Sequence, residues 1–148
     1  MPLYYLVYES QATQPFSETA LTALLEQARH YNTAHNVTGL LLHTPSGRLI
    51  QVLEGERGLV EALYLRIARD PRHQHCTILS SGPLPARRFG EWRMGFRATS
   101  EGALTTLRGH VDTAAAAFLL PLLPAVSGLL LTKLLEYVRR TPPHPLLQ

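Results

Sequence analysis

Between residues 3 and 98, short runs of aromatic, β-branched and leucine residues alternate with helix-like segments in a definite order. Short apolar runs bounded by glycine, proline or asparagine are typical of strands, and apolar residues spaced three and four apart are typical of helices. We expect strands at 3–8, 37–43, 48–54, 76–81 and 92–98. The same patterns predict a helix from the N-cap Ser17 to about Tyr31, and a second helix that opens at residues 55–58.

The order βαββαββ predicts an α+β protein with a ferredoxin-like plan: a five-stranded mixed sheet carrying both helices on one face. A right-handed crossover makes the first and third strands neighbours, so we expect Tyr8 and Gln51 to lie side by side. The space between the two helices, above these strands, is the natural ligand site. Two further helices are expected at 101–110 and 129–140, which divides the chain into a main domain, 1–100, and a C-terminal helical extension, 101–148.

Composition narrows the class of protein. The 148 residues carry a net charge of +3 and no run of five basic residues, which argues against nucleic-acid binding. The single cysteine, Cys76, excludes an internal disulfide and fits a reducing, cytoplasmic compartment. The N-terminal residues lack the basic and small-residue features of a secretory signal, so none is expected.

One uncharged stretch, 113–132, has the length of a membrane span. Pro121 and Pro124, followed by Ser127 and Gly128, divide it into two short pieces. This division favours a helix, a turn and a second helix packed on the domain, and we expect no membrane span.

Three polar side chains stand inside apolar segments. Tyr8 ends the first strand, Asn32 follows the first helix, and Gln51 alternates with Leu49 and Leu53 on what should be a buried face. A buried amide without a partner costs about 1–3 kcal/mol, so these groups should be paired with one another or with a ligand. The alternatives are a core tyrosine bonded to a strand carbonyl, a solvent-facing glutamine and an ordinary asparagine C-cap.

Four strings occur in a fixed order. They are Asn36-Val37-Thr38-Gly39-Leu40-Leu41, Gln51-Val52-Leu53-Glu54-Gly55, Asp70-Pro71-Arg72-His73 and Trp92-Arg93-Met94-Gly95-Phe96. With these strings the chain resembles the BLUF family of blue-light sensors that use a flavin, over residues 3 to about 97. The resemblance implies noncovalent FAD, with FMN or riboflavin as possible substitutes, and a photoreceptor rather than an enzyme.

The resemblance also implies roles for particular residues. Tyr8 would give an electron and then a proton to the excited flavin, and rearrangement of the Gln51 amide would produce a red-shifted state. Trp92 and Met94, with the same strand parity as Phe96, would face the site together and carry the output. The cofactor-binding residues would be Tyr8, Leu24, Ala28, Tyr31, Asn32, Leu41, Leu49, Gln51, Arg66, Ile67, Asp70 and His73.

Some of these positions leave alternatives open. Ala28 replaces a serine that is usual in the family, and Tyr31 replaces a small polar or imidazole side chain, so Tyr31 would stack on the flavin or crowd its entrance. Arg66 would hold the phosphate side of the cofactor or be a solvated helix residue. Trp92 and Met94 are equally compatible with core packing.

Other chemistries find less support in the sequence. His73 and His75 share a strand face, but no further ligands complete a metal site, and none is expected. Glu54 and Glu56 are expected at a solvated turn. A flavin-free interaction module remains an alternative, as does an acylphosphatase-like hydrolase, for which the Gly47-Arg48 turn is a loose match. No catalytic or DNA-binding module fits after residue 100, so the signal of a sensor would pass to an unknown separate protein or through a homo-oligomer.

Overall fold

The computed structural model describes residues 3–110 and 129–141. Its sheet has the strand order β4-β1-β3-β2-β5, with only the β2–β5 pair parallel. The strands are β1 Leu3–Ala12, β2 Thr38–His43, β3 Arg48–Glu56, β4 His73–Leu84 and β5 Gly95–Ala98. The helices are α1 Glu18–His35, α2 Arg57–Ala68, α3 Glu101–Arg108 and α5 Leu129–Arg140. The five-stranded mixed sheet and the α+β, ferredoxin-like fold are confirmed, including the adjacency of the first and third strands.

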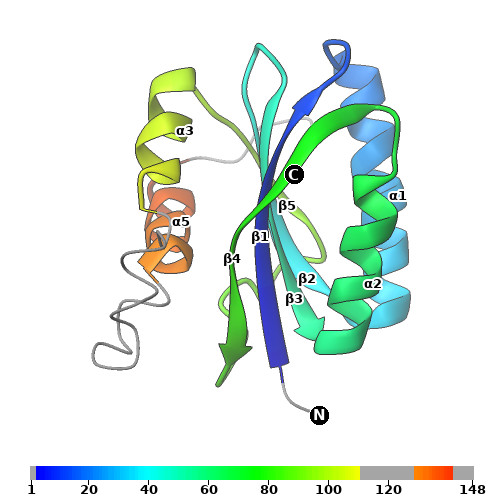
Figure 1. Cartoon of the computed structure of the whole chain (residues 1–148), viewed down its shortest axis with the longest axis vertical. Helices are drawn as coiled ribbons and strands as arrows, with labels where there is room; N and C mark the ends of the chain where they lie inside the picture. The colour runs from blue at the N-terminus through cyan, green and yellow to red at the C-terminus, as the bar shows by residue number, and fades with distance from the viewer. Residues whose placement is uncertain (1–2, 111–128, 142–148) are drawn as a thin grey trace.

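The sheet lies between two helical layers. Figure 1 shows α1 and α2 side by side on one face, and α3 and α5 on the other. Each face has its own apolar core: Leu25, Leu41 and Leu53 belong to the core under α1 and α2. Leu40 and Ile50 pack with Leu104 and Leu134 in the core under α3 and α5. Strand alternation explains this division, because Leu40 and Leu41 point to opposite faces of the same strand.

The helix ends follow local chemistry. The Ser17 side chain accepts a hydrogen bond from Ala20 N at 3.0 Å, which confirms the predicted N-cap of α1. The predicted end of this helix at Tyr31 is wrong. The helix runs to His35, because the left-handed residue is Asn36, whose φ of 55° provides the C-cap.

The segment before β5 departs from the prediction. A strand was expected from Trp92, but β5 begins at Gly95. Trp92 N donates to Phe89 O at 3.1 Å, so a turn precedes the strand. A turn has no two-residue alternation, and the expected shared face of Trp92 and Met94 is therefore wrong: Met94 belongs to the core under α1 and α2, whereas Trp92 packs against the opposite core.

The C-terminal part agrees with the expected helices where it is described. The helices α3 and α5 correspond to the predictions at 101–110 and 129–140. The helix-turn-helix expected within 113–132 lies mostly outside the described residues. No helix of the described part is long and apolar enough to cross a membrane. The division of the chain at residue 100 stays a prediction.

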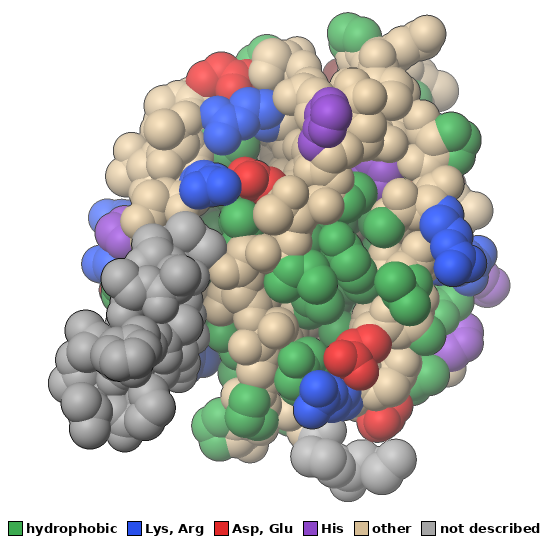
Figure 2. Space-filling model, viewed as in Figure 1, with side chains coloured by type: hydrophobic (Ala, Val, Ile, Leu, Met, Phe, Trp, Pro, Cys, Tyr) green, Lys and Arg blue, Asp and Glu red, His purple; other side chains and the backbone are tan. Residues whose placement is uncertain are grey.

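Large apolar side chains are also exposed on the described surface. Ile78 on the edge strand β4 is 47% exposed and Leu65 on α2 is 56% exposed. Figure 2 shows hydrophobic side chains gathered near the centre of the face on which β4 and α2 lie. The edge strand β4 itself contains no Lys, Arg, Asp or Glu, so no charged side chain of its own protects its exposed edge.

Candidate functional site

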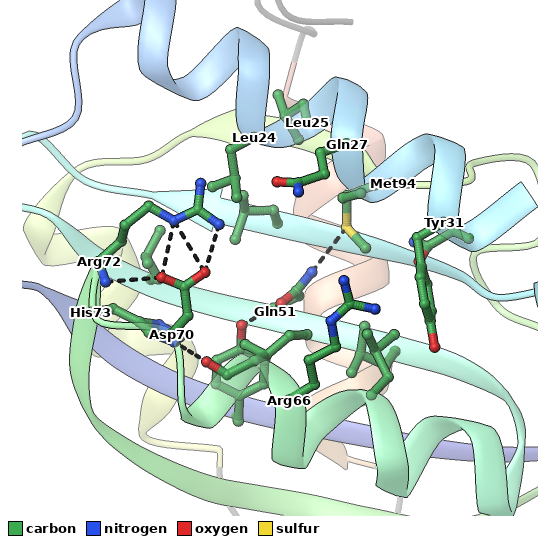
Figure 3. A pocket seen from close by; sticks show the side chains of 18 of the residues that line it. Leu24, Leu25, Gln27, Tyr31, Gln51, Arg66, Asp70, Arg72, His73 and Met94 are labelled. Carbon is green, nitrogen blue, oxygen red and sulfur yellow. Dashed lines mark hydrogen bonds and ion pairs between the residues drawn. The ribbon is translucent and has the colours of Figure 1, made fainter.

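A pocket opens between α1 and α2 above the central strands (Figure 3). All twelve residues predicted to bind the cofactor line this pocket, together with Met94. Arg72, which the Asp70-Pro71-Arg72-His73 string places near the flavin tail by the resemblance, also lines the pocket, and five further lining residues were not predicted: Phe16, Leu25, Gln27, Leu53 and Leu63. Two of them had a readable signal, because Leu53 follows Gln51 by strand alternation and Leu63 precedes Ile67 by one helical turn.

Tyr8 and Gln51 meet on the floor of the pocket. Their Cα atoms are direct partners in the antiparallel β1–β3 ladder, and their side chains are buried. The Tyr8 hydroxyl donates a hydrogen bond to Gln51 Oε1. Burial raises the pKa of the Tyr8 phenol far above its ordinary value, with smaller contributions from Cys76 and Tyr64. The phenol is therefore a neutral hydrogen-bond donor at physiological pH.

The other end of the Gln51 amide faces Met94. Gln51 Nε2 lies 3.4 Å from Met94 Sδ, and Figure 3 shows the two side chains pointing toward each other. A thioether sulfur is a weak acceptor and no donor, so it suits the NH₂ group better than the carbonyl oxygen. Tyr8 and Met94 thus favour one orientation of the amide, with Oε1 toward the phenol and Nε2 toward the sulfur.

Asn32 lies in the last turns of α1 with its side chain 2% exposed. Its Nδ2 donates to Arg93 O at 2.5 Å, which ties the helix to the segment that carries Met94. The structure gives Oδ1 no hydrogen bond to the described residues. Asn32 lines the pocket, and the C-cap of α1 is Asn36 rather than Asn32.

An aromatic and cationic stack closes one side of the pocket. The Arg66 guanidinium lies 5.1 Å from the centre of the Tyr31 ring, and the His35 ring stacks on Tyr31 with the ring centres 3.9 Å apart. Figure 3 shows Arg66 reaching across toward Tyr31. Cation–π contacts of this kind contribute about 0.5–1 kcal/mol at exposed sites. The stack joins α1 to α2 at the mouth of the pocket.

Charged and imidazole side chains lie together just after the C-terminal end of α2. Arg72 Nε lies 3.0 Å from Asp70 Oδ1, and Arg72 Nη2 lies 2.5 Å from Asp70 Oδ2, a two-pronged pair. The hydrogen bonds from Arg72 lower the pKa of the Asp70 carboxyl. His73 is fixed by Ser10 Oγ at 2.8 Å and by Ile67 O at 2.6 Å. This end of the pocket therefore presents arginine donors beside the apolar walls, while both ring nitrogens of His73 are already bonded.

Two other expectations change with the structure. The prediction that Glu54 is solvated is wrong. Glu54 is 0% exposed, and its carboxylate accepts hydrogen bonds from Arg88 N at 2.7 Å and from Phe89 N at 2.9 Å. Glu56 caps α2 by accepting from Gly58 N and Leu59 N, each at 3.0 Å. No local pattern indicates the two backbone donors, because Arg88 and Phe89 lie more than thirty residues further along the chain.

The Gly47-Arg48 turn, which loosely matched an acylphosphatase-like hydrolase, binds to residues of α3. Gly47 has a φ of 91° and Arg48 Nη1 donates to Thr105 Oγ1 at 2.9 Å. The same guanidinium pairs with Glu101 at 3.6 Å. Within the described ranges, no group of three or more His, Cys, Asp or Glu side chains is arranged to hold a metal ion.

Most of the chain matches the model of a known protein family. The family model described as "BLUF: Sensors of blue-light using FAD" matches residues 3–95. The chain belongs to the BLUF family. It is a sensor of blue light that uses a flavin, and the BLUF domain itself is not an enzyme.

Relatives of this BLUF chain are light-activated signalling proteins. It is 42% identical over 90 residues to the photoactivated adenylate cyclase subunit beta of Euglena gracilis, a match that covers 60% of this chain. It is 39% identical over 88 residues to the subunit alpha of the same organism. The matches cover 10% and 8% of those proteins, so this chain spans only about a tenth of their length.

Solved structures show the same fold. The dark-state BLUF protein BlrB superposes with a TM-score of 0.61 at 30% identity, covering 72% of this chain and 78% of that one. The BlsA photo-activated state gives 0.71 at 23% identity and covers 96% and 98%, a likeness of fold. Klebsiella pneumoniae BlrP1 with FMN and cyclic diGMP gives 0.61 at 26% identity, covering 79% and 33%.

The residues of the pocket fit a flavin. Its apolar walls, such as Leu24 and Leu49, suit the faces of a flat aromatic ring. The amides of Asn32 and Gln51 supply hydrogen-bonding groups for a polar ring edge. The guanidinium groups of Arg66 and of Arg72, at the C-terminal end of α2, suit a phosphorylated tail.

Proposed function

We propose that Tyr8 and Gln51 perform the light reaction of this sensor. The flavin supplies an electron acceptor when it absorbs blue light. Tyr8 gives up an electron and then its phenolic proton, the Gln51 amide rearranges, and the electron and proton return to Tyr8. No covalent bond joins the flavin to the protein, and the electron and the proton both return to Tyr8, so the product differs only in the Gln51 amide and its hydrogen bonds. The observation that carries this proposal is the hydrogen bond from the Tyr8 hydroxyl to Gln51 Oε1.

The amide is the switching group because its two ends differ chemically and hardly differ in shape. In the present arrangement Oε1 accepts from Tyr8 and Nε2 faces Met94 Sδ. Reversal or tautomerisation changes which atom of Gln51 faces each neighbour, so the amide would present a donor to a bound flavin, and such a hydrogen bond would shift the flavin's absorption to the red. The reversed amide would set its oxygen against the sulfur of Met94. The two would repel, and the segment that carries Met94 would move.

We propose FAD as the flavin, with FMN and riboflavin as weaker ligands. Arg66 and Arg72 line the pocket and offer donors to the phosphates of a cofactor tail. We expect Arg66→Gln to lower the affinity for FAD several-fold and to leave the affinity for riboflavin nearly unchanged. Equal losses for both flavins, measured by fluorescence titration of the apoprotein, would contradict a role of Arg66 at the tail.

The signal leaves through the other face of the sheet. Met94 precedes β5, and the core on that other face contains Leu104, Leu130 and Leu134 of the C-terminal helices. We propose that the helical extension passes the change to a separate protein or to a second copy of the chain in a homo-oligomer. The single cysteine supports a cytoplasmic site of action.

The test is the light-minus-dark absorption spectrum of the purified protein. A yellow protein whose flavin bands shift to the red under blue light and return in darkness supports the proposal. A flavin that stays bound and shows no reversible shift would remove the light reaction proposed for Tyr8 and Gln51.

A further inference from the structure

A second groove lies on the opposite side of the sheet from the flavin pocket, between the segment before β5 and the helix α5. Five of the chain's thirteen arginines line it, and the only tryptophan of the chain lies among them. These residues are Arg87, Arg88, Arg97, Arg139, Arg140 and Trp92. Only one carboxylate, Glu91, is among the lining residues. We call this site the arginine groove.

The guanidinium groups of the arginine groove form no ion pair with any carboxylate of the described residues. Arg88 donates to Thr132 Oγ1 at 2.8 Å, and Arg97 Nε donates to Thr141 O at 3.0 Å, both neutral acceptors. Arg139 and Arg140 are exposed on the last turn of α5. Like charges held this close favour an anionic partner.

The groove is built as part of the fold. Arg97 is 7% exposed, and its guanidinium lies 5.7 Å from the centre of the Trp92 ring. Burial lowers the pKa of Arg97, so an anion above it would relieve the cost of holding this cation. Apolar atoms of Phe89 and Val138 form part of the lining. Arginine beside tryptophan over an apolar base is the composition of binding hot spots in protein interfaces.

We propose that the arginine groove is the docking site for an acidic segment of a partner protein. Charge complementarity selects the acidic segment, because bidentate arginine–carboxylate pairs add geometry to the attraction. A protein segment is favoured over a nucleic acid because the cations occupy one short groove with an apolar base. Nucleic acids need a longer basic track, and the whole chain carries a net charge of only +3.

The arginine groove and the flavin pocket are both lined by residues of the short segment before β5. Trp92 lines the arginine groove, and Met94, two residues further, lines the pocket beside Gln51. Movement at Met94 therefore reaches the groove through one intervening residue. Light control of docking rests on the light reaction proposed above, whereas docking in the dark does not.

The experiment uses Trp92 as a local reporter, since it is the chain's only tryptophan. A capped octaglutamate peptide is titrated into the flavin-loaded protein in the dark while tryptophan emission is followed. We expect saturable binding that weakens at least tenfold in R139E/R140E and falls steeply with added salt. The matched control, R57E/R69E, reverses two exposed arginines on the α2 side and should bind normally. Unchanged flavin absorption in both variants shows that they are folded.

Other outcomes decide against the proposal. Equal binding to wild type and R139E/R140E, or no binding of the peptide, overturns the groove as an acidic-segment site. Tighter binding of single-stranded octathymidylate than of octaglutamate would assign the groove to nucleic acid instead. The titration repeated under blue light tests the coupling separately: a change in affinity that is absent in Tyr8→Phe supports it, while dark binding in that variant stays as in the wild type.

Discussion

Tyr8 and Gln51 are directly opposed residues of neighbouring antiparallel strands, and the hydroxyl of the first donates to the side-chain oxygen of the second. Forty-three positions separate them in the chain, yet the ladder of β1 and β3 fixes their Cα atoms relative to each other. A phenol and an amide on two packed strands keep their relative position while the bonding between them changes. This rigidity is what a switch based on a single hydrogen bond requires.

Replacement of Tyr8 by Phe removes the hydroxyl that donates to Gln51 and keeps the ring. We expect flavin to remain bound and the reversible red shift to disappear in the light-minus-dark spectrum. Tyr5→Phe is the matched control, because Tyr5 lies on the same strand and its hydroxyl bonds Ser80 Oγ at 2.7 Å in the opposite core. A normal photocycle in Tyr8→Phe would exclude Tyr8 from the light reaction.

Replacement of Gln51 by Leu keeps the approximate size of the side chain and removes both of its hydrogen-bonding ends. The red shift should be lost, and the buried Tyr8 hydroxyl should cost about 1–3 kcal/mol of stability unless the flavin satisfies it. Gln27→Leu changes the same residue type at the exposed rim of the pocket and should retain the shift. Illuminated spectra and denaturant unfolding of both variants measure the two effects. A red shift of wild-type size in Gln51→Leu would refute the amide switch.

Replacement of Glu54 by Gln tests the buried carboxylate that holds the β4–β5 connection. Its two oxygens accept from the backbone N–H groups of Arg88 and Phe89, and an amide NH₂ would face one of these donors. We expect the free energy of unfolding to fall by about 1–3 kcal/mol, measured from the denaturant midpoint. The control Glu61→Gln alters an exposed ion pair with Arg57 and should change stability by less than about 0.5 kcal/mol. Similar stabilities of the two variants would contradict the assigned role of Glu54.

His43 predicts a pH dependence of stability. Its Nε2 is buried without a hydrogen-bond partner in the described structure, and burial lowers the pKa of its imidazole from the ordinary 6.5. The unfolded chain then binds the proton more readily, so this contribution to stability is complete above about pH 6.5 and is lost as pH falls toward the lower folded pKa.

The variant His43→Leu should therefore lose less stability than the wild type between about pH 7 and about pH 5. Denaturant unfolding at each pH measures the difference. His30→Leu changes an exposed histidine of α1 and should keep the wild-type slope. Parallel pH profiles of the wild type and His43→Leu would show that His43 binds its proton equally well in the folded and unfolded states, which would contradict this prediction.

Regular elements were predictable because their periodicity is local. Alternation of Leu49, Gln51 and Leu53 indicated the inward face of β3, and the structure agrees. The handedness of crossovers then made β1 its neighbour, which is why the pocket floor was predictable. The connection between β4 and β5 was not predictable, because turns have no periodic pattern of apolar residues. Trp92 and Met94 consequently lie on opposite sides of the sheet, against the prediction.

The sequence alone determined the order of strands and helices, the N-cap at Ser17 and the residues that share the inward face of β3, since each depends on neighbours a few positions away. Only the tertiary structure decided that Glu54 is buried and that five arginines converge on one groove. These arrangements join positions far apart in the chain, and the free energy that holds them arises only when the sheet and its two layers have packed.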